Sequence, residues 1–275
     1  MLTSKLEVLV EFGPKIDQQL LDKTLNELKS YDGVTEAIFK DGAIMVETTL
    51  PSTVVVDLVT RTSGKRAVLQ GFGDMQSAVS MVSSQSCCKG GVMGVIRFQQ
   101  SPEGPLVADG CIDGLTPGLH GLHVHEAGDL SQGCKSIGGH YNPSGSRPFP
   151  EERRHAGDLG NVVADESGRA TFRIVDEVLK VWDIIGRSVA VTGGCDDLGK
   201  GSVAASKVNC DSGPPVACGI IARSAGVFQN PKRICACDGV VVWDERDRPL
   251  AGRGRREKEC CQKEKENGIK RCCKV

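Results

Sequence analysis

Residues 91–228 limit the fold more than any other part of the sequence, because short apolar runs alternate there with glycine-containing turns. Runs of this length, bounded by turn residues, are typical of strands rather than long helices. The chain has 34 glycines and only 4% aromatic residues, which also favours strands and tight turns. At least six strands are predicted, in VMGVIRFQQ, LVADGCIDGL, LHGLHVHEAG, GNVVADESGRATFRIVD, IIGRSVAVTG and VACGIIARS. We therefore predict an all-β domain over residues 91–228, as an antiparallel barrel or sandwich.

A mixed α/β pattern precedes this region, in residues 5–71. KLEVLVEF reads as a strand, and the following segment has leucines at helical spacing with Asp17 near its start. Asp41-Gly42 separates two strand-like runs and indicates a hairpin. A second helix in PSTVVVDLVTRTS and a last strand in KRAVLQGFG complete the order β-α-β-β-α-β. This order predicts a ferredoxin-like domain over residues 1–74, followed by a small, polar linker over 75–90.

The last part of the chain, residues 229–275, has no hydrophobic period beyond Trp243 and ends in RGRREKECCQKEKENGIKRCCKV. Such a segment cannot bury a core, so we predict a largely disordered tail. The net charge of −1 argues against a general nucleic-acid binder. The sequence has no apolar run of about 20 residues and no recognisable signal peptide, so we expect a soluble, cytoplasmic protein without a membrane span.

Thirteen cysteines are unevenly placed, because none precedes Cys87 and six follow residue 230. In a reducing compartment, cysteines indicate metal binding or redox chemistry more often than a disulfide framework. Cys235 and Cys237 flank a single residue, so both sulfurs can reach one soft ion such as Cu(I). Lys232 and Arg233 would lower the pKa of these thiols and favour the ligating thiolates.

Histidine is scarce, and the five present are His120, His123, His125, His140 and His155. His123 and His125 are two residues apart, so on a strand they point to the same face. A pair of imidazoles suits copper or zinc. The alternative is that these rings pack in the barrel with backbone hydrogen bonds, and we favour it for His120, His123 and His125 because half a copper site binds weakly.

Five motifs make the all-β region resemble the copper/zinc superoxide dismutases. They are GLHGLHVHEAGDL, GGHYNP, RRHAGDLGNV, DDLGKGS and ACGII, and they cover residues 91–222 in that family's order. The resemblance implies an eight-stranded Greek-key β-barrel. An α/β domain before the barrel and a Cys-x-Cys segment after it resemble, more narrowly, the family of copper chaperones for superoxide dismutase. In that family, the Cys-x-Cys motif delivers Cu(I) and helps to form the enzyme's disulfide by thiol exchange.

The resemblance implies a damaged copper site. His123, His125 and His140 match three of the family's four copper ligands, but Thr192 stands at the place of the fourth histidine. A hydroxyl is a poor copper ligand beside imidazole. The arginine that attracts superoxide is also replaced, within Pro214-Pro215-Val216. We therefore expect that this chain is not a dismutase, and not an enzyme.

The implied zinc site is better preserved. His140, His155 and Asp158 match three of its four ligands, but the loop segment SGSRPFPEER lacks the remaining histidine. Water, His125 or another side chain would complete the tetrahedral shell, or the site would stay empty. Asp196 matches the aspartate that orients the metal-binding histidines in the family, and here it would at least brace its loop.

The resemblance further implies a disulfide and a partner surface. Cys134 and Cys218 match the family's intrasubunit disulfide, and the alternative is two buried thiols. The barrel would pair with a copper/zinc superoxide dismutase in a heterodimer, or with a second copy of itself. The matching interface positions are Gly128, Ile185, Gly186, Ile221 and Arg223.

The first domain departs from the chaperone family, whose Met-x-Cys-x-x-Cys copper loop is replaced by EFGPKIDQQ. This domain would dock the target, stabilise the protein, or act with Cys87-Cys88, and we favour docking or a scaffold. The pairs Cys260-Cys261 and Cys272-Cys273 would add Cu(I) ligands to the tail, or they are incidental or lipidated; the sequence leaves both open. Cys111, Cys195 and Cys210 have no predicted partner.

Three functions follow from these observations. The leading hypothesis is a metallochaperone that delivers Cu(I) to a copper/zinc superoxide dismutase, with zinc as a second metal. A copper-buffering or docking protein without delivery is the alternative, and a divergent superoxide dismutase is the third. For a chaperone, the family implies the cytoplasm and also the mitochondrial intermembrane space.

Overall fold

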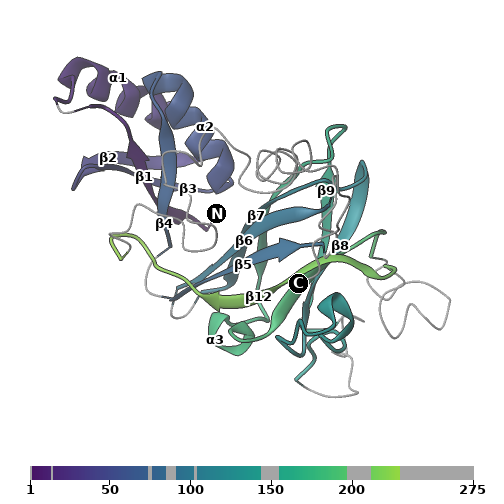
Figure 1. Cartoon of the computed structure of the whole chain (residues 1–275). Coiled ribbons are helices and arrows are strands. Elements are labelled where there is room, and N and C mark those ends of the chain that lie inside the picture. The colour runs from purple at the N-terminus through teal and green to yellow at the C-terminus, as the bar shows by residue number, and fades with distance from the viewer. Residues whose placement is uncertain are drawn as a thin grey trace, which may run out of the picture.

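The computed structural model describes residues 2–13, 15–73, 76–84, 91–101, 104–143, 155–196 and 212–229. These residues form an α/β domain and a β-barrel, which lie against each other (Figure 1). The predicted tail cysteines and Cys87, Cys88 and Cys210 lie outside the described residues. None of the helices in the described part of the chain is long and apolar enough to cross a lipid bilayer.

The first domain has the predicted ferredoxin-like order. Its elements are β1 (Ser4–Val10), α1 (Gln18–Lys29), β2 (Val34–Lys40), β3 (Ala43–Thr48), α2 (Ser52–Ser63) and β4 (Ala67–Phe72). The strands form an antiparallel sheet in the order β2-β3-β1-β4. Both helices cover one face of this sheet, where Leu28 and Val55 share a core with Val8 and Ile44. The prediction of this domain is confirmed.

Local sequence signals explain the ends of these elements. The Asp17 carboxylate accepts hydrogen bonds from the backbone N–H groups of Gln19 (3.0 Å) and Leu20 (3.2 Å), so it caps α1 at the predicted position. Asp41 and Gly42 both have positive φ, +52° and +84°, as a two-residue hairpin turn between β2 and β3 requires.

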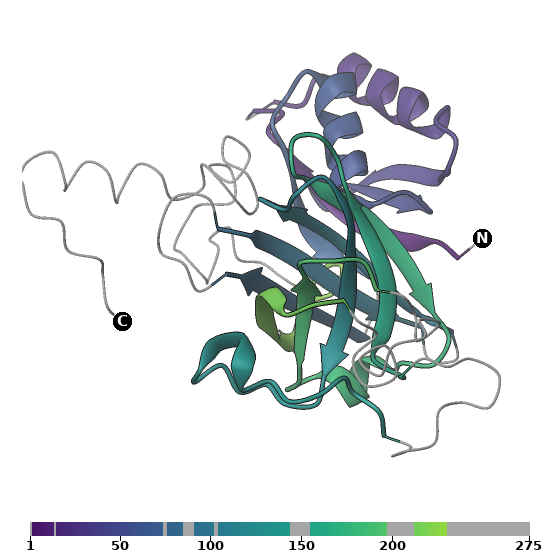
Figure 2. The same cartoon turned by 90° about the vertical axis from the view of Figure 1, so that its right-hand side faces the viewer.

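The second domain is a closed barrel of eight strands. They are β5 (Gln76–Ser83), β6 (Met93–Gln100), β7 (Leu106–Asp113), β8 (Gly118–His125), β9 (Asp158–Ala164), β10 (Ala170–Asp176), β11 (Ser188–Thr192) and β12 (Pro215–Arg223). The order around the barrel is β10-β7-β6-β5-β12-β11-β8-β9, which confirms the expected eight-stranded barrel. Figure 2 shows the barrel strands from the side. Phe98, Ile112 and Leu122 are fully buried in the barrel core.

The expected linker over residues 75–90 is wrong for residues 76–83, because they form barrel strand β5. β5 lies between β6 and β12 and pairs with both. Its inward side chains Ala78, Ser80 and Val82 are small or polar, yet each is at most 1% exposed. The small and polar composition of this segment is typical of a linker, although its buried and exposed side chains alternate as they do in a strand. Residues 85–90 lie outside the described residues.

Buried polar contacts join the two domains. The Asp109 carboxylate on β7 accepts hydrogen bonds from the backbone N–H of Ser52 (2.8 Å) and from the Ser52 hydroxyl, at the start of α2. Arg173 on β10 donates to the Ser4 hydroxyl (2.7 Å) and to the Leu2 carbonyl (3.2 Å). Burial raises the pKa of Asp109, and the Ser52 hydrogen bonds partly offset this. The first domain is therefore fixed to the barrel.

Replacing Asp109 by alanine should weaken this junction. The change leaves the N–H and hydroxyl of Ser52 without their partner in a buried place, which costs about 1–3 kcal/mol. Urea unfolding should show this loss, and Asp109→Asn should lose less because its amide oxygen still accepts. Asp32→Ala, at an exposed position, is the control, and an equal effect of both alanine variants would contradict the assignment.

Candidate metal centre

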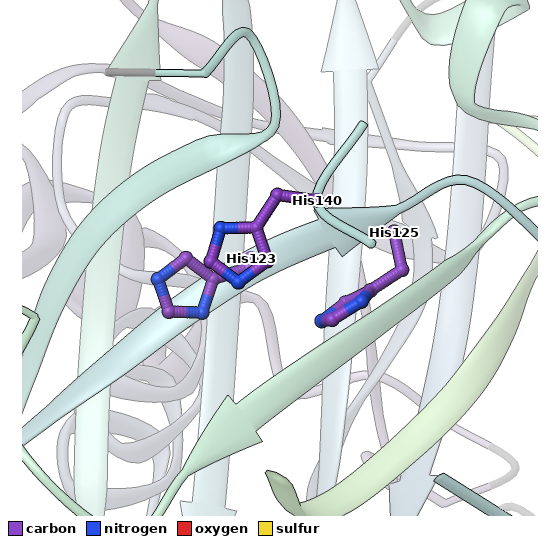
Figure 3. Close-up of side chains that lie close together, drawn as sticks. All are labelled: His123, His125 and His140. Carbon is purple, nitrogen blue, oxygen red and sulfur yellow. The ribbon is translucent and has the colours of Figure 1, made fainter. Parts of the chain in front are cut away.

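Three histidines meet at one end of the barrel. His123 and His125 lie at the end of β8, and His140 lies in the following loop, joined to His125 by an isolated β-bridge. Figure 3 shows the three rings grouped beside the strands. One ligand atom of each histidine lies within 4.8 Å of the others. The structure therefore brings together the three residues that the sequence assigned to a copper site.

Hydrogen bonds fix the orientation of two of these rings. Nε2 of His123 lies 2.9 Å from Oδ2 of Asp196, and Nδ1 of His125 lies 3.0 Å from the Gly138 carbonyl oxygen. Both oxygens are acceptors, so these ring nitrogens carry the hydrogen. The other nitrogens, Nδ1 of His123 and Nε2 of His125, are buried and make no hydrogen bond. A buried lone pair without a partner is what a metal ligand requires.

A second cluster shares His140. Nδ1 of His140 lies 2.7 Å from Oδ1 of Asp158, and Nδ1 of His155 lies 3.4 Å from Oδ2. The His155 ring nitrogen is buried and makes no well-aligned hydrogen bond, although it is close to the carboxylate. The backbone N–H of His155 donates to Oδ2 at 2.7 Å. The residues assigned to a zinc site therefore meet around one buried carboxylate.

The electrostatics of this cluster favour a charged carboxylate. Burial alone would raise the pKa of Asp158, but the hydrogen bond with the His140 ring and the close contact with the His155 ring outweigh it, so the pKa lies well below its usual range. The contact with Asp158 raises the pKa of His155, partly against burial. Burial lowers the pKa of His125 to about 4, so its ring is neutral at pH 7 and can act as a ligand.

Thr192 does not replace the missing copper ligand. It lies on β11 next to Gly121 of β8, and its buried hydroxyl lies 3.2 Å from the Gly121 carbonyl oxygen and 3.0 Å from that of Gly194. Gly121 is needed there, because a Cβ would lie 2.6 Å from Cε1 of His123 and 2.7 Å from the Thr192 hydroxyl. The hydroxyl is therefore held by the backbone.

The His123 and His140 rings stack face to face, with centroids 4.1 Å apart and planes at 22°. Imidazole nitrogens bind a metal in the ring plane, at about 2.0–2.1 Å for zinc. An ion equidistant from both rings would lie out of both planes, so one ring must rotate before the two can share an ion. Within the described residues, these three histidines thus lie close together but do not form a preformed copper site.

His120 has the structural role that we favoured. Its Nδ1 lies 2.8 Å from the Thr192 carbonyl oxygen, and its Nε2 lies 2.8 Å from the Thr116 carbonyl oxygen. Both ring nitrogens are therefore occupied by the backbone, and His120 connects β11 to the turn before β8.

The expected disulfide is present. Cys134, in the 3-10 turn η1 (Gly133–Lys135), is bonded to Cys218 on β12, with Cα atoms 5.8 Å apart. It packs against Ile137 and Ala190, so it ties the loop after β8 to the barrel wall. Two other cysteines are free in the described part of the chain: Cys111 is buried, with a pKa raised by burial, and Cys195 is exposed.

The predicted partner surface stays a prediction, and the structure shows where its residues lie and corrects one of them. Gly128 packs against Gly186, where a Cβ on Gly128 would lie 2.2 Å from the Gly186 carbonyl oxygen. Ile185 and Arg223 line a pocket of about 280 Å³ beside α3 (Val181–Ile184). Ile221 is fully buried in the barrel core and is not a surface residue. Because side chains alternate along a strand, its neighbour Ile220 faces outward instead and is 43% exposed.

Comparison with known proteins places this geometry in a family. The family described as "Copper/zinc superoxide dismutase (SODC)" matches residues 92–221, which span all of the barrel except β5 and the end of β12. Several relatives carry the name "Copper chaperone for superoxide dismutase". The pig protein is 49% identical to this chain, over 90% of this chain and 93% of its own length. The human protein is 51% identical, over 87% of this chain and 89% of its own length. The rat protein is likewise 51% identical. These relatives are named as chaperones rather than enzymes, in agreement with the expectation that the chain is not a dismutase.

Acid should destabilise the metal-free protein through His125. Its pKa falls from 6.5 to about 4 on folding, so between these values the unfolded chain binds a proton that the folded chain does not. Stability is therefore lost as the pH falls through this window, by roughly 2–4 kcal/mol from this group. Urea unfolding in EDTA at pH 7 and pH 4.5 should show a smaller difference for His125→Gln. Equal differences would contradict the burial argument.

Proposed function

This chain belongs to the family of copper chaperones for superoxide dismutase, and on that premise we propose that it delivers Cu(I) to a copper/zinc superoxide dismutase. Delivery takes place in a heterodimer, and the tail assists formation of the partner's disulfide by thiol–disulfide exchange. In that exchange, the partner's thiol pair is oxidised as a disulfide of the tail is reduced.

The observation that carries this proposal is a complete eight-stranded barrel that lacks one of the four copper ligands. The strands, the disulfide and the three histidines are retained, whereas Thr192 is bonded to the backbone where a fourth imidazole is needed. A barrel in this condition suits recognition of a similar barrel better than redox catalysis.

Copper is cargo in this proposal, and Cys235 and Cys237 hold it. Two thiolates separated by one residue bind Cu(I) in preference to hard cations. The cysteines of the described residues suit this task less well, because Cys134 and Cys218 form the disulfide, Cys111 is buried, and Cys195, although exposed, is a single thiol. Cys260, Cys261, Cys272 and Cys273 extend the capacity of the same tail.

Zinc is the metal that fits the second cluster. His140, His155 and Asp158 offer two imidazoles and a carboxylate, which is a usual zinc donor set, and the His155 ring nitrogen is buried without a good hydrogen bond. When bound, zinc supplies a structural link between the loop that carries His140 and the start of β9. The fourth ligand comes from water or from outside the described residues.

The partner surface combines the Gly128–Gly186 contact with the outward residues of β12 and α3. Ile220 and Trp182 are 43% and 51% exposed, so they can supply the apolar centre of an interface. Arg223 and Ile185 line the adjacent pocket. A dismutase with the same barrel offers a similar face, which allows a two-fold arrangement.

A buffering or docking protein remains the second candidate. The observation that favours it is the first domain, because residues 1–86 contain no cysteine or histidine and cannot take up Cu(I) by the family's usual loop. The two candidates differ in whether copper leaves the chain.

The tail cysteines should be required for delivery. The Cu(I)-loaded chain should activate a reduced, zinc-loaded, copper-free dismutase, and Cys235→Ser/Cys237→Ser should lower this activation at least tenfold. Cys111→Ser, at a buried thiol, is the matched control and should retain it. If neither the chain nor its variants activate the dismutase although the heterodimer forms, the docking function is correct instead.

Loss of the Asp158 carboxylate should weaken zinc binding. Asp158→Asn keeps the size of the side chain but removes a charged ligand, so zinc affinity should fall by at least the roughly 10–100-fold that loss of an outer-shell partner costs, because a metal-ligand bond and its charge are lost. Competition with a chromophoric chelator measures the affinity. Asp165→Asn, on an exposed turn, is the control. Unchanged zinc binding in Asp158→Asn would exclude this cluster as the site.

A further inference from the structure

The segment that precedes the tail leaves the barrel and lies against the first domain. Residues 226–229, here called the tail root, follow β12 and run past β4 (Figure 1). The backbone N–H of Val227 donates to the Gly73 carbonyl oxygen at 2.9 Å. The backbone N–H of Phe228 donates to Oε2 of Glu7 at 2.7 Å. The first domain thus binds the chain seven residues before Cys235.

An irregularity in the sheet of the first domain creates room for this contact. Glu7 of β1 pairs with Gly71 of β4, whereas the next residue, Val8, pairs with Leu69, so β4 carries one extra residue. Such a bulge redirects nearby side chains. Gly71 has no Cβ, and an added Cβ would lie 2.8 Å from Cα of Val227 and 2.7 Å from Oε2 of Glu7. The tail root therefore fits only because residue 71 is glycine.

Hydrogen bonds within the tail root also fix its own conformation. Phe228 has a φ of +60°, a left-handed conformation that is uncommon for a large side chain and persists only where neighbouring contacts hold it. The backbone N–H of Gln229 donates to the Gly226 carbonyl oxygen, and its side-chain oxygen accepts from the Gly226 N–H. The Lys40 ammonium lies 4.9 Å from the centre of the Phe228 ring.

The surface that holds the tail root is itself fixed to the barrel. Glu7 lies on β1, whose first residue, Ser4, bonds to Arg173 and Gln99 of the barrel. Asp109 holds the start of α2 in the same domain. Glu7 is only 5% exposed, so its carboxylate is part of a packed interface and not a passing surface contact. The tail root is therefore held in one place relative to the barrel face proposed for the partner.

We propose that the first domain, which has no copper ligands, anchors the tail root and so sets the point from which Cys235 and Cys237 reach the partner. This inference rests on the proposed function of the tail. Glu7, Gly71 and Lys40 are positioning residues and contact no metal. In this arrangement, the domain contributes to copper delivery by shortening the tether and not by carrying copper.

Chain length gives the size of the expected effect. The anchor holds the chain up to Gln229, six residues before Cys235. Without the anchor, the described residue held nearest to Cys235 is Ser224, whose backbone N–H donates to the Ser77 carbonyl oxygen at 2.9 Å, eleven residues before Cys235. For a tail that is disordered, as its sequence predicts, the effective concentration of its cysteines at the partner falls with about the −3/2 power of the tether length. Release of the anchor should therefore slow copper transfer by about two- to threefold.

Gly71→Ala tests the anchor directly. Amide hydrogen exchange at Val227 and Phe228 should be slow in the unchanged chain and at least tenfold faster in Gly71→Ala and in Glu7→Ala. Glu7→Gln should restore most of the protection because its amide oxygen still accepts the Phe228 N–H. Glu36→Ala, at an exposed position on β2, is the matched control. Fast exchange in the unchanged chain, or full protection in both alanine variants, would overturn the anchor.

Transfer kinetics test the consequence. With Cu(I) loaded and the copper-free dismutase varied, Glu7→Ala should lower the saturating rate two- to threefold but leave both the half-saturating concentration and the Cu(I) affinity unchanged. A full rate in a variant whose exchange protection is lost would overturn the positioning role and leave the proposed function intact. No activation even by the unchanged chain would instead refute the proposed function, and the exchange result would still decide the anchor.

Discussion

The closed ring of strand pairing in the barrel is the constraint on which the rest of the structure depends. β5 completes it by pairing with β6 on one side and β12 on the other, so that the neighbouring strands have no free edge. Closure fixes β8 beside β9 and β11, which places His123 next to Asp196 and Asp158 next to His140. It also gives the first domain a firm surface, because Asp109 and Arg173 project from β7 and β10.

Two departures distinguish this barrel from the resemblance-implied pattern of a dismutase: Thr192 at the place of the fourth copper histidine, and Pro214-Pro215-Val216 at the place of the arginine. The Thr192 hydroxyl contacts the carbonyl oxygens of Gly121 and Gly194, and the Thr192 carbonyl oxygen accepts a hydrogen bond from His120. Residue 192 of β11 therefore makes packing contacts, whereas a copper site with four histidines requires a ligand at this position. The cluster around Asp158 does not involve Thr192, and its three side chains still lie together, as the proposed zinc site requires.

Much of this could be predicted from the sequence where a signal is local. Asp17 caps α1 and Asp41-Gly42 turns the hairpin, because each acts on its own neighbours in the chain. Residues 76–83 resembled a linker, since their strand character comes from two distant pairing partners. Ile221 was expected at the surface but lies in the core, because the family resemblance alone does not show which side of β12 faces inward. Glu7 and Gly71 gave no signal, because their partner lies more than 150 residues away.

The most direct test of the proposed function is to identify the atoms that coordinate the copper. The full chain, loaded anaerobically with one equivalent of Cu(I), would be measured by X-ray absorption spectroscopy at the copper edge. The proposed function predicts that sulfur atoms surround the copper, because thiolates are preferred ligands of Cu(I) and the three histidines do not form a preformed site. A shell of imidazole nitrogens that persists in Cys235→Ser/Cys237→Ser would contradict copper binding by the tail, since the histidines of the barrel would then hold the copper.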